Sequence, residues 1–240
     1  MIPNLFVIIN LKQVVLFLIF MKKIAIIPIK QNSERVPGKN FRFIAGKPLY
    51  RYLLDNLKYC NFDDIYVDSD SDEIREYCSS NGYNFLQRKP ELALNTANGN
   101  DLLNYHRQLI DSDLYFQLFV TSPLLTVETI NKCIELLSTN NDKDSIMTVK
   151  SFFSWYWYDG KPINYDPCVL PRSQDAKPVV METTGLYGIK KQSLDIRKAR
   201  IGFDPIFHEV SDFESIDLDN ETDFEYLNYY VQNNSSSSNC

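Results

Sequence analysis

The chain contains 240 residues, which is enough for one well-buried domain with a small appendage. Hydrophobic residues make up 44% of it and charged residues 23%, proportions typical of an ordinary soluble globular protein. The formal net charge of −6 argues against general nucleic-acid binding, because that activity requires a basic face. A local basic cluster could still bind a phosphorylated small molecule.

The cysteines and histidines argue against two kinds of metal site and indicate a compartment. The five cysteines are widely spaced and include no C-x-x-C pair, so they form neither a zinc motif nor a disulfide framework. Free thiols are typical of a reducing compartment, and we therefore expect a cytoplasmic protein. The two histidines, His106 and His208, are too few for a histidine-rich metal site.

The two ends of the chain differ in composition from its middle. Residues 1–20 are apolar but interrupted by polar residues, so they are too short for a membrane span and lack the pattern of a signal peptide. We treat them as an N-terminal extension, with Met21 as the expected functional start and a weak membrane anchor as the alternative. Residues 233–240 form an Asn/Ser tail that we expect to be disordered, which leaves 21–232 as the domain.

Short apolar runs alternate with amphipathic segments after Met21. Residues 24–29 form a continuous apolar run that ends in a polar loop, as expected for a central parallel strand buried on both faces. The next expected elements are a helix at 49–59, a strand at 65–67, a helix at 72–80, a strand at 83–86, a helix at 99–110, a strand at 114–120, a helix at 127–137 and a strand at 145–149. This alternation predicts a doubly wound, mostly parallel α/β sheet of Rossmann-like type, in which ligands bind beyond the carboxyl ends of the strands.

The alternation stops at residues 151–180. A dense group of aromatic residues there is followed by a proline-rich stretch, which predicts an excursion from the sheet. Such an apolar cluster is usually covered, either by a second subunit or by its own domain. The chain is expected to return to the sheet at 186–189 and 214–218 and to end in a helix at 221–232.

The polar loop at 30–40 combines basic residues, neutral donors and one glycine. The basic residues are Lys30, Arg35 and Lys39, the neutral donors are Asn32, Ser33 and Asn40, and the glycine is Gly38. A loop of this composition after a buried strand can wrap a triphosphate with backbone N–H groups and cationic side chains. Its glycine spacing matches neither a Walker A loop nor a dinucleotide fingerprint. By composition alone, a solvated basic loop is the alternative.

Two aspartate pairs are candidates for a metal site, Asp68 with Asp70 and Asp217 with Asp219. Residues i and i+2 on a strand or at its end point to one side, so two such carboxylates can hold one hard cation such as Mg²⁺. Turn formation and helix capping account better for the first pair. The second pair follows Ile216 in an apolar setting, where two unpaired like charges would be costly, and is the better metal candidate.

Six segments along the chain combine into a recognisable set of motifs. They are IIPIKQNS at 26–33 continuing to KN at 39–40, AGKPL at 45–49, RKPELA at 88–93, TSPL at 121–124, TGLY at 184–187 and SIDLD at 215–219. In this order and spacing they resemble the acylneuraminate cytidylyltransferase family, whose members make CMP-activated nonulosonic acids such as CMP-sialic acid. The resemblance runs from residue 24 to about 231, and the related Kdo cytidylyltransferases share the fold.

The resemblance implies a set of binding residues and partners. For CTP it implies Lys30, Ser33, Lys39 and Asn40 around the phosphates and ribose, with Arg88 and Asn98 near the cytidine. For the sugar acid it implies Thr121, Ser122, Arg172, Gln174, Glu182 and Tyr187. For Mg²⁺ it implies Asp217 and Asp219. The excursion at 151–180 resembles the dimerisation arm of the family, so a homodimer is expected.

The implied reaction is attack by the anomeric hydroxyl of an acidic sugar on the α-phosphorus of CTP, with release of pyrophosphate. Positioning and charge neutralisation promote such a step, so cations and Mg²⁺ suit it better than a covalent nucleophile does. Lys30, Lys39 and Asp217 are the implied catalytic residues. The sequence identifies no general base, and Asp217 acting through a metal-bound water is one candidate.

Four positions depart from the family pattern. Lys30 stands where Arg is common and Glu34 where Lys is common, so a carboxylate opposes the triphosphate unless it turns away or pairs with Arg35. Phe119 replaces a substrate-facing Gln and Leu125 replaces an Arg, and neither can make the lost hydrogen bonds. These departures affect the identity of the sugar more than that of the nucleotide.

Three alternatives to an acylneuraminate-type enzyme remain open from the sequence. A Kdo-type cytidylyltransferase would use the same fold and nucleotide. A glycosyltransferase of similar architecture would place Asp68 and Asp70 on the metal of a sugar-nucleotide donor. A non-catalytic nucleotide-binding protein would follow if Glu34, Phe119 and Leu125 have disabled the site.

Overall fold

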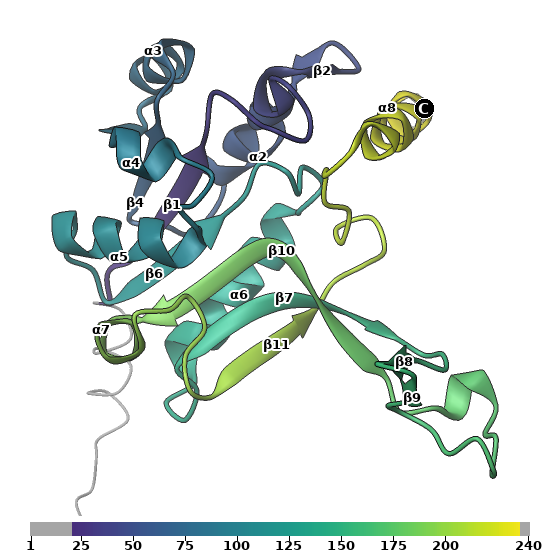
Figure 1. The fold of residues 1–240 in the computed structure, drawn as a ribbon. Coiled ribbons are helices and arrows are strands. Elements are labelled where there is room, and N and C mark those ends of the chain that lie inside the picture. The colour runs from purple at the N-terminus through teal and green to yellow at the C-terminus, as the bar shows by residue number, and fades with distance from the viewer. Residues whose placement is uncertain (1–20, 236–240) are drawn as a thin grey trace, which may run out of the picture.

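The computed structural model describes residues 21–235, and its centre is a seven-stranded sheet (Figure 1). The strands, from one edge to the other, are β11 (Pro205–Glu209), β7 (Ser145–Phe152), β10 (Val179–Lys190), β6 (Leu114–Leu118), β1 (Lys23–Ile29), β4 (Asp64–Ser69) and β5 (Asn84–Gln87). Strand β10 is antiparallel to both of its neighbours, and the other paired strands of this sheet are parallel. The order, with β1 near the middle, is that of a doubly wound sheet, as predicted.

Helices cover both faces of the sheet. One face packs against α2 (Leu49–Leu57), α3 (Asp72–Asn81) and α6 (Val127–Thr139), and the other against α5 (Gly99–Leu109) and α7 (Lys191–Arg197). The remaining elements are β2 (Phe43–Ile44), β3 (Lys47–Pro48), β8 (Trp157–Tyr158), β9 (Lys161–Pro162), α4 (Pro90–Ala93), α8 (Glu221–Ser235) and the 3₁₀ turns η1 (Lys39–Phe41) and η2 (Ser173–Asp175). Within residues 21–235, no helix combines the length and apolarity needed to cross a membrane.

The apolar run of β1 explains its central position. Ala25, Ile27 and Ile29 pack into the layer of α2, α3 and α6, while Ile24 and Ile26 pack into the layer of α5 and α7. All five side chains are fully buried. Burying an isoleucine side chain contributes about 1.5–3 kcal/mol, so a strand that is apolar on both faces is most stable between two helical layers.

The last strand of the sheet lies elsewhere than predicted. The predicted strand at 214–218 is wrong, because this segment is irregular and its polar groups bind the loop after β6. Glu214 accepts a hydrogen bond from the Thr126 hydroxyl at 2.8 Å, and the Leu218 N–H donates to the Thr121 carbonyl at 2.9 Å. The edge position is taken by β11, which begins with Pro205, a residue tolerated at the start of an edge strand.

The C-terminal helix α8 packs beside the loop that follows β1. Phe224 and Leu227 of α8 share an apolar cluster with Val36 and Leu218. The helix continues to Ser235 and so includes three residues that the sequence placed in a disordered tail. The expectations for residues 1–20 and for 236–240 lie outside the described residues.

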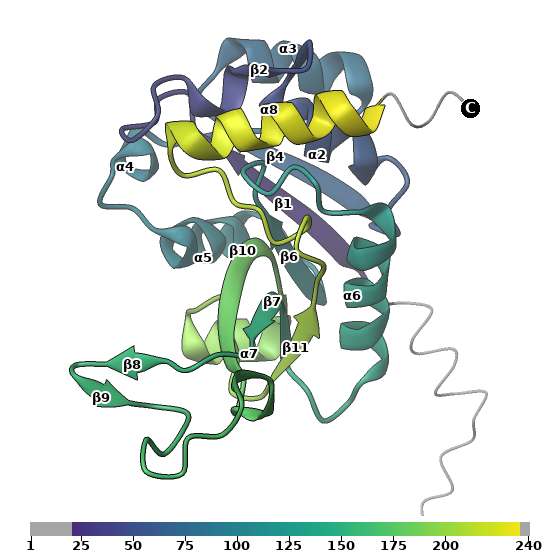
Figure 2. The same cartoon turned by 90° about the vertical axis from the view of Figure 1, so that its right-hand side faces the viewer.

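Residues 153–178, between β7 and β10, leave the sheet and project from the body as an arm that carries the β8–β9 hairpin (Figures 1 and 2), so the excursion is slightly shorter than the expected 151–180. The rings of Trp155 and Trp157 contact Tyr165 with centroids 6.0 and 6.4 Å apart, so the arm has a small aromatic cluster of its own. Most of its aromatic surface is nevertheless accessible, with Trp157 57% exposed and Tyr158 77% exposed. The predicted excursion from the sheet is therefore confirmed.

Candidate functional site

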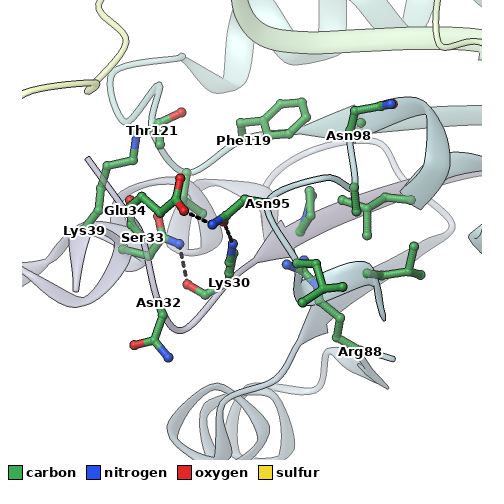
Figure 3. Close-up of a pocket in the computed structure, with 18 of the residues that line it drawn as sticks. Lys30, Asn32, Ser33, Glu34, Lys39, Arg88, Asn95, Asn98, Phe119 and Thr121 are labelled. Carbon is green, nitrogen blue, oxygen red and sulfur yellow. Dashed lines mark hydrogen bonds between the residues drawn. The ribbon is translucent and has the colours of Figure 1, made fainter. Parts of the chain in front are cut away.

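A cavity of about 430 Å³ lies beyond the carboxyl ends of β1, β5 and β6 (Figure 3). Its walls come from the loop after β1, from Arg88 after β5, from residues 119–121 after β6 and from the beginning of α5. Seven of the residues predicted to bind ligands line it, namely Lys30, Ser33, Lys39, Asn40, Arg88, Asn98 and Thr121. The sheet topology thus brings together loops that are far apart in the sequence, at the edge where a doubly wound sheet binds ligands.

The loop after β1 is fixed at several points. The fully buried Val36 anchors its middle in the cluster with Leu218 and α8, and the Asn40 side-chain amide donates to the Lys30 carbonyl at 2.8 Å. Gly38 has φ 65°, a left-handed conformation that glycine adopts without strain, and it starts the turn η1 that carries Lys39. The basic loop is consequently folded over the cavity, and is not a freely solvated segment.

Three basic side chains, Lys30, Arg35 and Lys39, line one end of this cavity. Lys39 Nζ donates to the Leu218 carbonyl and lies 3.2 Å from Asp219 Oδ1. Arg35 lies 2.7 Å from the same carboxylate oxygen, and Lys30 donates to the side chain of Asn95. Asp219 therefore balances two of the cations in this structure. A polyanionic ligand at this end would compete with Asp219 for both of them.

Glu34 follows neither of the two arrangements expected from the sequence, in which its carboxylate turns away from the cavity or pairs with Arg35. Its carboxylate accepts a hydrogen bond from Asn95, which in turn accepts one from Lys30 (Figure 3). It neither turns away from the cavity, which it lines, nor pairs with Arg35, which binds Asp219. Asn95 was not singled out from the sequence, because nothing in its local pattern indicates that it bridges to a loop some sixty positions earlier.

A buried ion pair positions Arg88 at the opposite end of the cavity. Its guanidinium donates from Nε to the Asp68 carboxylate and, at 3.2 Å, to the Asp68 carbonyl. His106 Nε2 lies 2.7 Å from the other carboxylate oxygen of Asp68. Asp68 and His106 are fully buried and Arg88 is 4% exposed. The turn and capping interpretation is therefore wrong for Asp68, which lies within β4, and the N-cap residue of the following helix α3, Ser71, makes no side-chain capping bond.

Asn98 caps the helix that faces the cavity. Its side-chain oxygen accepts hydrogen bonds from the N–H groups of Asn100 and Asp101, and Asp101 accepts one from the Asn98 N–H. This reciprocal capping box fixes the start of α5, whose positive dipole end then borders the cavity at Gly99. The side chain of Asn98 is thus committed to the helix, while its backbone and neighbours form the wall.

Neither Asp217 nor Asp219 is among the residues that line the cavity, and Asp217 has an oxygen that is buried and unpartnered within the described residues. Burial raises its pKa above the ordinary range, the hydroxyls of Thr121 and Thr184 act against that rise, and the charge of Asp219 adds to it. A hard cation would relieve this arrangement, so Asp217 with Asp219 fits the predicted Mg²⁺ pair. No group of three acidic, histidine or cysteine ligands occurs between residues 21 and 235, so ligand phosphates would have to complete the coordination.

The residues predicted for the sugar acid fall into three places. Thr121 lines the cavity, whereas Ser122 and Tyr187 are buried behind it. Glu182 accepts a hydrogen bond from the Tyr187 hydroxyl at 2.7 Å on β10. Arg172 and Gln174 lie on the projecting arm, outside this cavity; Arg172 pairs with the nearby Asp175 at 2.6 Å. Their predicted contact with the sugar stays a prediction.

The two replaced family positions also differ in location. Phe119 lines the cavity, so its aromatic ring occupies the wall where the resemblance places a Gln (Figure 3). Leu125 is 1% exposed and belongs to the main core, so it packs and takes no part in the cavity. Only the first replacement therefore changes the cavity surface directly.

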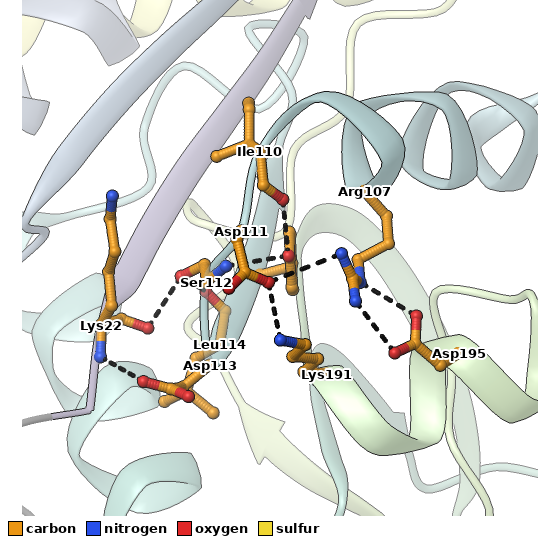
Figure 4. A network of polar contacts seen from close by, with 10 residues as sticks. Lys22, Arg107, Ile110, Asp111, Ser112, Asp113, Leu114, Lys191 and Asp195 are labelled. Atoms are coloured by element: carbon orange, nitrogen blue, oxygen red, sulfur yellow. Dashed lines mark hydrogen bonds and ion pairs between the residues drawn. The ribbon is translucent and has the colours of Figure 1, made fainter.

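A second polar network lies at the other edge of the sheet, where β1 and β6 begin (Figure 4). Arg107 on α5 binds Asp195 on α7 through two bonds of 2.9 and 3.0 Å, and Asp111 binds Lys191 at 2.6 Å. These side chains hold α5 and α7 together beneath the sheet. Each charge has a partner of opposite sign, so the network stabilises the position of α5 and offers no free ligand.

Comparison with known proteins agrees with this architecture. The cytidylyltransferase family model matches residues 24–235. The N-acylneuraminate cytidylyltransferase of Streptococcus agalactiae serotype V is 28% identical over 215 residues, which make up 85% of this chain and 52% of that protein. The pseudaminic acid cytidylyltransferase of Campylobacter jejuni is 32% identical over 132 residues, 51% of this chain and 56% of that protein.

A similar fold occurs in a solved structure of CMP:2-keto-3-deoxy-manno-octonic acid synthetase complexed with CTP. The TM-score is 0.65 at 14% identity, and the match covers 89% of this chain and 99% of the other. The chain spans about half the length of the curated relatives it matches. Because the family model covers nearly all of the described residues, this chain belongs to the cytidylyltransferase family.

Proposed function

We propose that the chain transfers CMP from CTP to the anomeric hydroxyl of an acidic sugar and releases pyrophosphate. The observation that carries the proposal is the cavity at the carboxyl edge of the sheet, with Lys30, Arg35 and Lys39 at one end and Arg88 at the other. In a chain of the cytidylyltransferase family, a site with basic side chains at both ends suits a nucleoside triphosphate.

The three cations suit the triphosphate end. Charge on the phosphates increases and redistributes as the α-phosphorus is attacked, and positioned cations stabilise that charge more in the transition state than in the substrate. Lys39 is only 9% exposed and held by the Leu218 carbonyl, so its ammonium group is already oriented before a ligand enters. We assign Lys39 and Lys30 to the phosphates on this basis, with Ser33 and Asn40 in the same loop.

Asp217 and Asp219 would hold Mg²⁺ in this proposal, and the ion would neutralise phosphate charge when bound. The buried and unpartnered oxygen of Asp217 supports this assignment. Asp219 would have to exchange at least one of its contacts, with Arg35 or Lys39, for the cation. Those basic side chains are then released toward the phosphates, so metal and nucleotide would be expected to bind together.

An acidic sugar is the acceptor class that the named relatives suggest. One is called an N-acylneuraminate cytidylyltransferase and another a pseudaminic acid cytidylyltransferase. The Phe119 wall leaves the individual acid open, including a Kdo-type acid. Cys60, Cys78, Cys133 and Cys168 are free thiols, which fits the reducing cytoplasm as the site of the reaction.

We also propose that the protein works as a homodimer joined through the arm. The exposed rings of Phe153, Trp157 and Tyr158 form the kind of apolar, aromatic surface that subunit interfaces cover. Arg172 and Gln174 lie on the same arm, so a partner's arm could deliver them to the cavity.

A glycosyltransferase that uses Asp68 and Asp70 is less well supported. Asp68 is enclosed by Arg88 and His106, and Asp70 accepts a hydrogen bond from the Gln31 N–H at 2.7 Å. Both oxygens of Asp68 are therefore occupied by protein partners, which leaves the pair without a free Asp68 carboxylate for a metal-bound donor.

The direct test incubates the protein with CTP, Mg²⁺ and a panel of N-acetylneuraminate, pseudaminate and Kdo. We expect pyrophosphate release together with the mass of a CMP-sugar for at least one acid. Consumption of a sugar nucleotide in place of CTP would indicate a glycosyltransferase. Calorimetric CTP binding without turnover of any acid would indicate a non-catalytic nucleotide-binding protein.

Replacing Lys39 by Ala tests the phosphate assignment. Loss of one charge-assisted contact is expected to raise the KM for CTP by about tenfold or more. Lys58→Ala is the matched control, because Lys58 is exposed, does not line the cavity and donates from its ammonium group to Asn81 at 2.9 Å. Equal KM values for the two variants would remove Lys39 from the phosphate site.

A further inference from the structure

Arg200 lies against the cavity wall, although no sequence motif singles it out. A Cβ atom placed on Gly99 would be 2.8 Å from Arg200 Nη1, and Gly99 lines the cavity. The guanidinium carbon is also 5.8 Å from the centre of the Phe119 ring, another part of the wall. The missing side chain of Gly99 therefore leaves room for a cation at the edge formed by Gly99 and Phe119.

The guanidinium group of Arg200 is held in place, but its N–H donors lack hydrogen-bond acceptors among the described residues. Its carbon lies 3.7 Å above the centre of the Tyr187 ring, which fixes its plane by stacking. The Arg200 backbone N–H donates to Asn100 Oδ1 at 2.9 Å, which ties the residue to α5. Among the described residues its side-chain N–H groups make no hydrogen bond, and the carboxylate beside it, Glu182, is 4.0 Å away.

This combination is unusual for a purely structural arginine. The side chain is 25% exposed, so three quarters of it has left water while its five N–H donors have no close protein acceptor. Stacking on an aromatic face leaves the donors at the edge of the guanidinium plane available for a second, planar group. A carboxylate is the group whose geometry matches that edge through two parallel hydrogen bonds.

The cavity wall at Phe119 lacks a hydrogen-bonding side chain, and Arg200 can supply one beside it. Phe119 presents a ring where a hydrogen-bonding side chain is expected, and Leu125 is buried in the core. At the phosphate end, Lys39 and Arg35 already contact Asp219, and at the other end Arg88 is bound to Asp68. Arg200 is the described arginine beside the Phe119 wall that retains its fork of donors.

We infer that Arg200 binds the carboxylate of the acidic sugar and so determines which acceptors this chain uses, an assignment that rests on the proposed function. The stacked Tyr187 and the adjacent Glu182, whose carboxylate lies 4.0 Å away, position the guanidinium. The carboxylate of the acceptor then lies against Phe119, with its anomeric hydroxyl directed toward the phosphate end of the cavity.

The experiment compares Arg200→Gln with the wild-type protein on a sugar acid and on its methyl ester. For the wild type, esterification is expected to raise the acceptor KM, because it removes the charge that Arg200 binds. Arg200→Gln is expected to raise the KM for the free acid by about 10- to 100-fold, the loss of a hydrogen bond between charged groups, and to leave the KM for CTP within about twofold. The variant should no longer distinguish acid from ester.

Two further variants separate binding from folding. Arg200→Lys keeps the charge and loses the planar fork, so it should recover part of the acid preference. Arg197→Gln is the control, because Arg197 is exposed at the end of α7 and stacks on Phe203, away from the cavity. Thermal unfolding of each variant shows whether its fold is retained.

The outcomes distinguish this assignment from the proposed function. Equal loss of activity on acid and ester, or a parallel rise in the KM for CTP, would assign Arg200 a structural role and overturn the inference. Unchanged acid preference in both Arg200 variants would overturn it as well. A wild-type protein that converts no sugar acid overturns the proposed function and this assignment together.

Discussion

At the scale of single residues, Asp68 organises one end of the cavity although it does not line it. Its two carboxylate oxygens bind Arg88 and His106, and all three side chains lie in the protein interior. A buried carboxylate is tolerated when both oxygens have partners, and a buried guanidinium is tolerated when its charge is balanced. The direction of Arg88 toward the cavity therefore depends on Asp68.

Replacing Asp68 by Asn should destabilise the protein strongly, because it leaves the buried Arg88 without a counter-charge. We expect the free energy of unfolding in urea to fall by about 3 kcal/mol or more. Asp72→Asn is the control: its side chain is 92% exposed and 3.4 Å from Arg75, so a change within about 0.5 kcal/mol is expected. Similar losses in the two variants would mean that the buried pair has no special role.

Unlike Asp68, Asp217 is expected to lower the stability of the folded protein while it supports activity. Its raised pKa means that the folded protein holds this proton more tightly than the unfolded chain does, so its ionisation at neutral pH destabilises the fold. Asp217→Asn, measured in the presence of a chelator, is expected to unfold at a higher urea concentration than the wild type at neutral pH. The stability advantage of the variant should disappear below about pH 4, because Asp217 is then protonated in both the folded and the unfolded wild-type protein.

The same Asp217→Asn protein is expected to lose Mg²⁺-dependent pyrophosphate release. A stabilised variant that retains full metal-dependent activity would show that the buried carboxylate is not a metal ligand. An Asp217→Asn protein that is less stable than the wild type would contradict the inference that the buried charge of Asp217 destabilises the fold.

At the scale of elements, the root of the arm is paired to the sheet, whereas the hairpin at its end leaves its side chains exposed. Strands β7 and β10 pair through Phe152 and Val179 to the base of the arm, so its root is rigidly attached to the sheet. Beyond that point the β8–β9 hairpin has only two residues in each strand and leaves its aromatic side chains exposed. A hairpin this short is stable only when it packs on another surface.

Substituting both Trp157 and Tyr158 by Ser should convert the protein from dimer to monomer. The two exposed rings contribute apolar area to the proposed interface and little to the body, so the melting temperature of the monomer should change little at low protein concentration. Light scattering coupled to size-exclusion chromatography measures the mass directly. A wild-type protein that is already monomeric would contradict the proposed homodimer.

At the scale of the whole molecule, several carboxyl groups favour the folded state at neutral pH. Burial acts to raise the pKa of Asp144, but the N–H groups of Phe203 and Asp204 outweigh it and lower the pKa. Burial is likewise outweighed at Glu214 by the hydroxyls of Thr129 and Thr126, and at Asp55 by Lys47. Each of these groups binds its proton less tightly in the folded protein than in the unfolded chain.

These lowered pKa values make stability fall with acidification. Their contribution is fully present above about pH 4, the range of unfolded carboxyl groups, and is lost as pH falls through the lower folded values. Urea unfolding at a series of pH values should show the free energy of unfolding decreasing from neutral pH toward pH 3 or so. Asp144→Asn should give a shallower decrease, and stability that increases on acidification would mean that raised groups such as Asp217 dominate.

The sequence by itself determined the two-layer core and the position of the cavity. The short apolar run of β1, bounded by a polar Pro/Gly-containing loop, favours a strand buried on both faces, and amphipathic helices follow at the expected places. The loop from Lys30 to Asn40 must then emerge at the carboxyl edge of the sheet. Local residue type and periodicity are sufficient for these inferences, because they depend on neighbours within a few positions.

Only the tertiary structure decided which polar side chains bind one another. Nothing local pairs Asp68 with His106, Glu34 with Asn95, or Arg200 with Tyr187, because each contact joins separate elements that the tertiary fold brings together. The exchange of the expected strand at 214–218 for β11 has the same cause: the polar groups of 214–218 satisfy the loop after β6 rather than a neighbouring strand. The sequence thus predicted where the cavity lies, and contacts between residues far apart in the sequence determine which polar groups surround it.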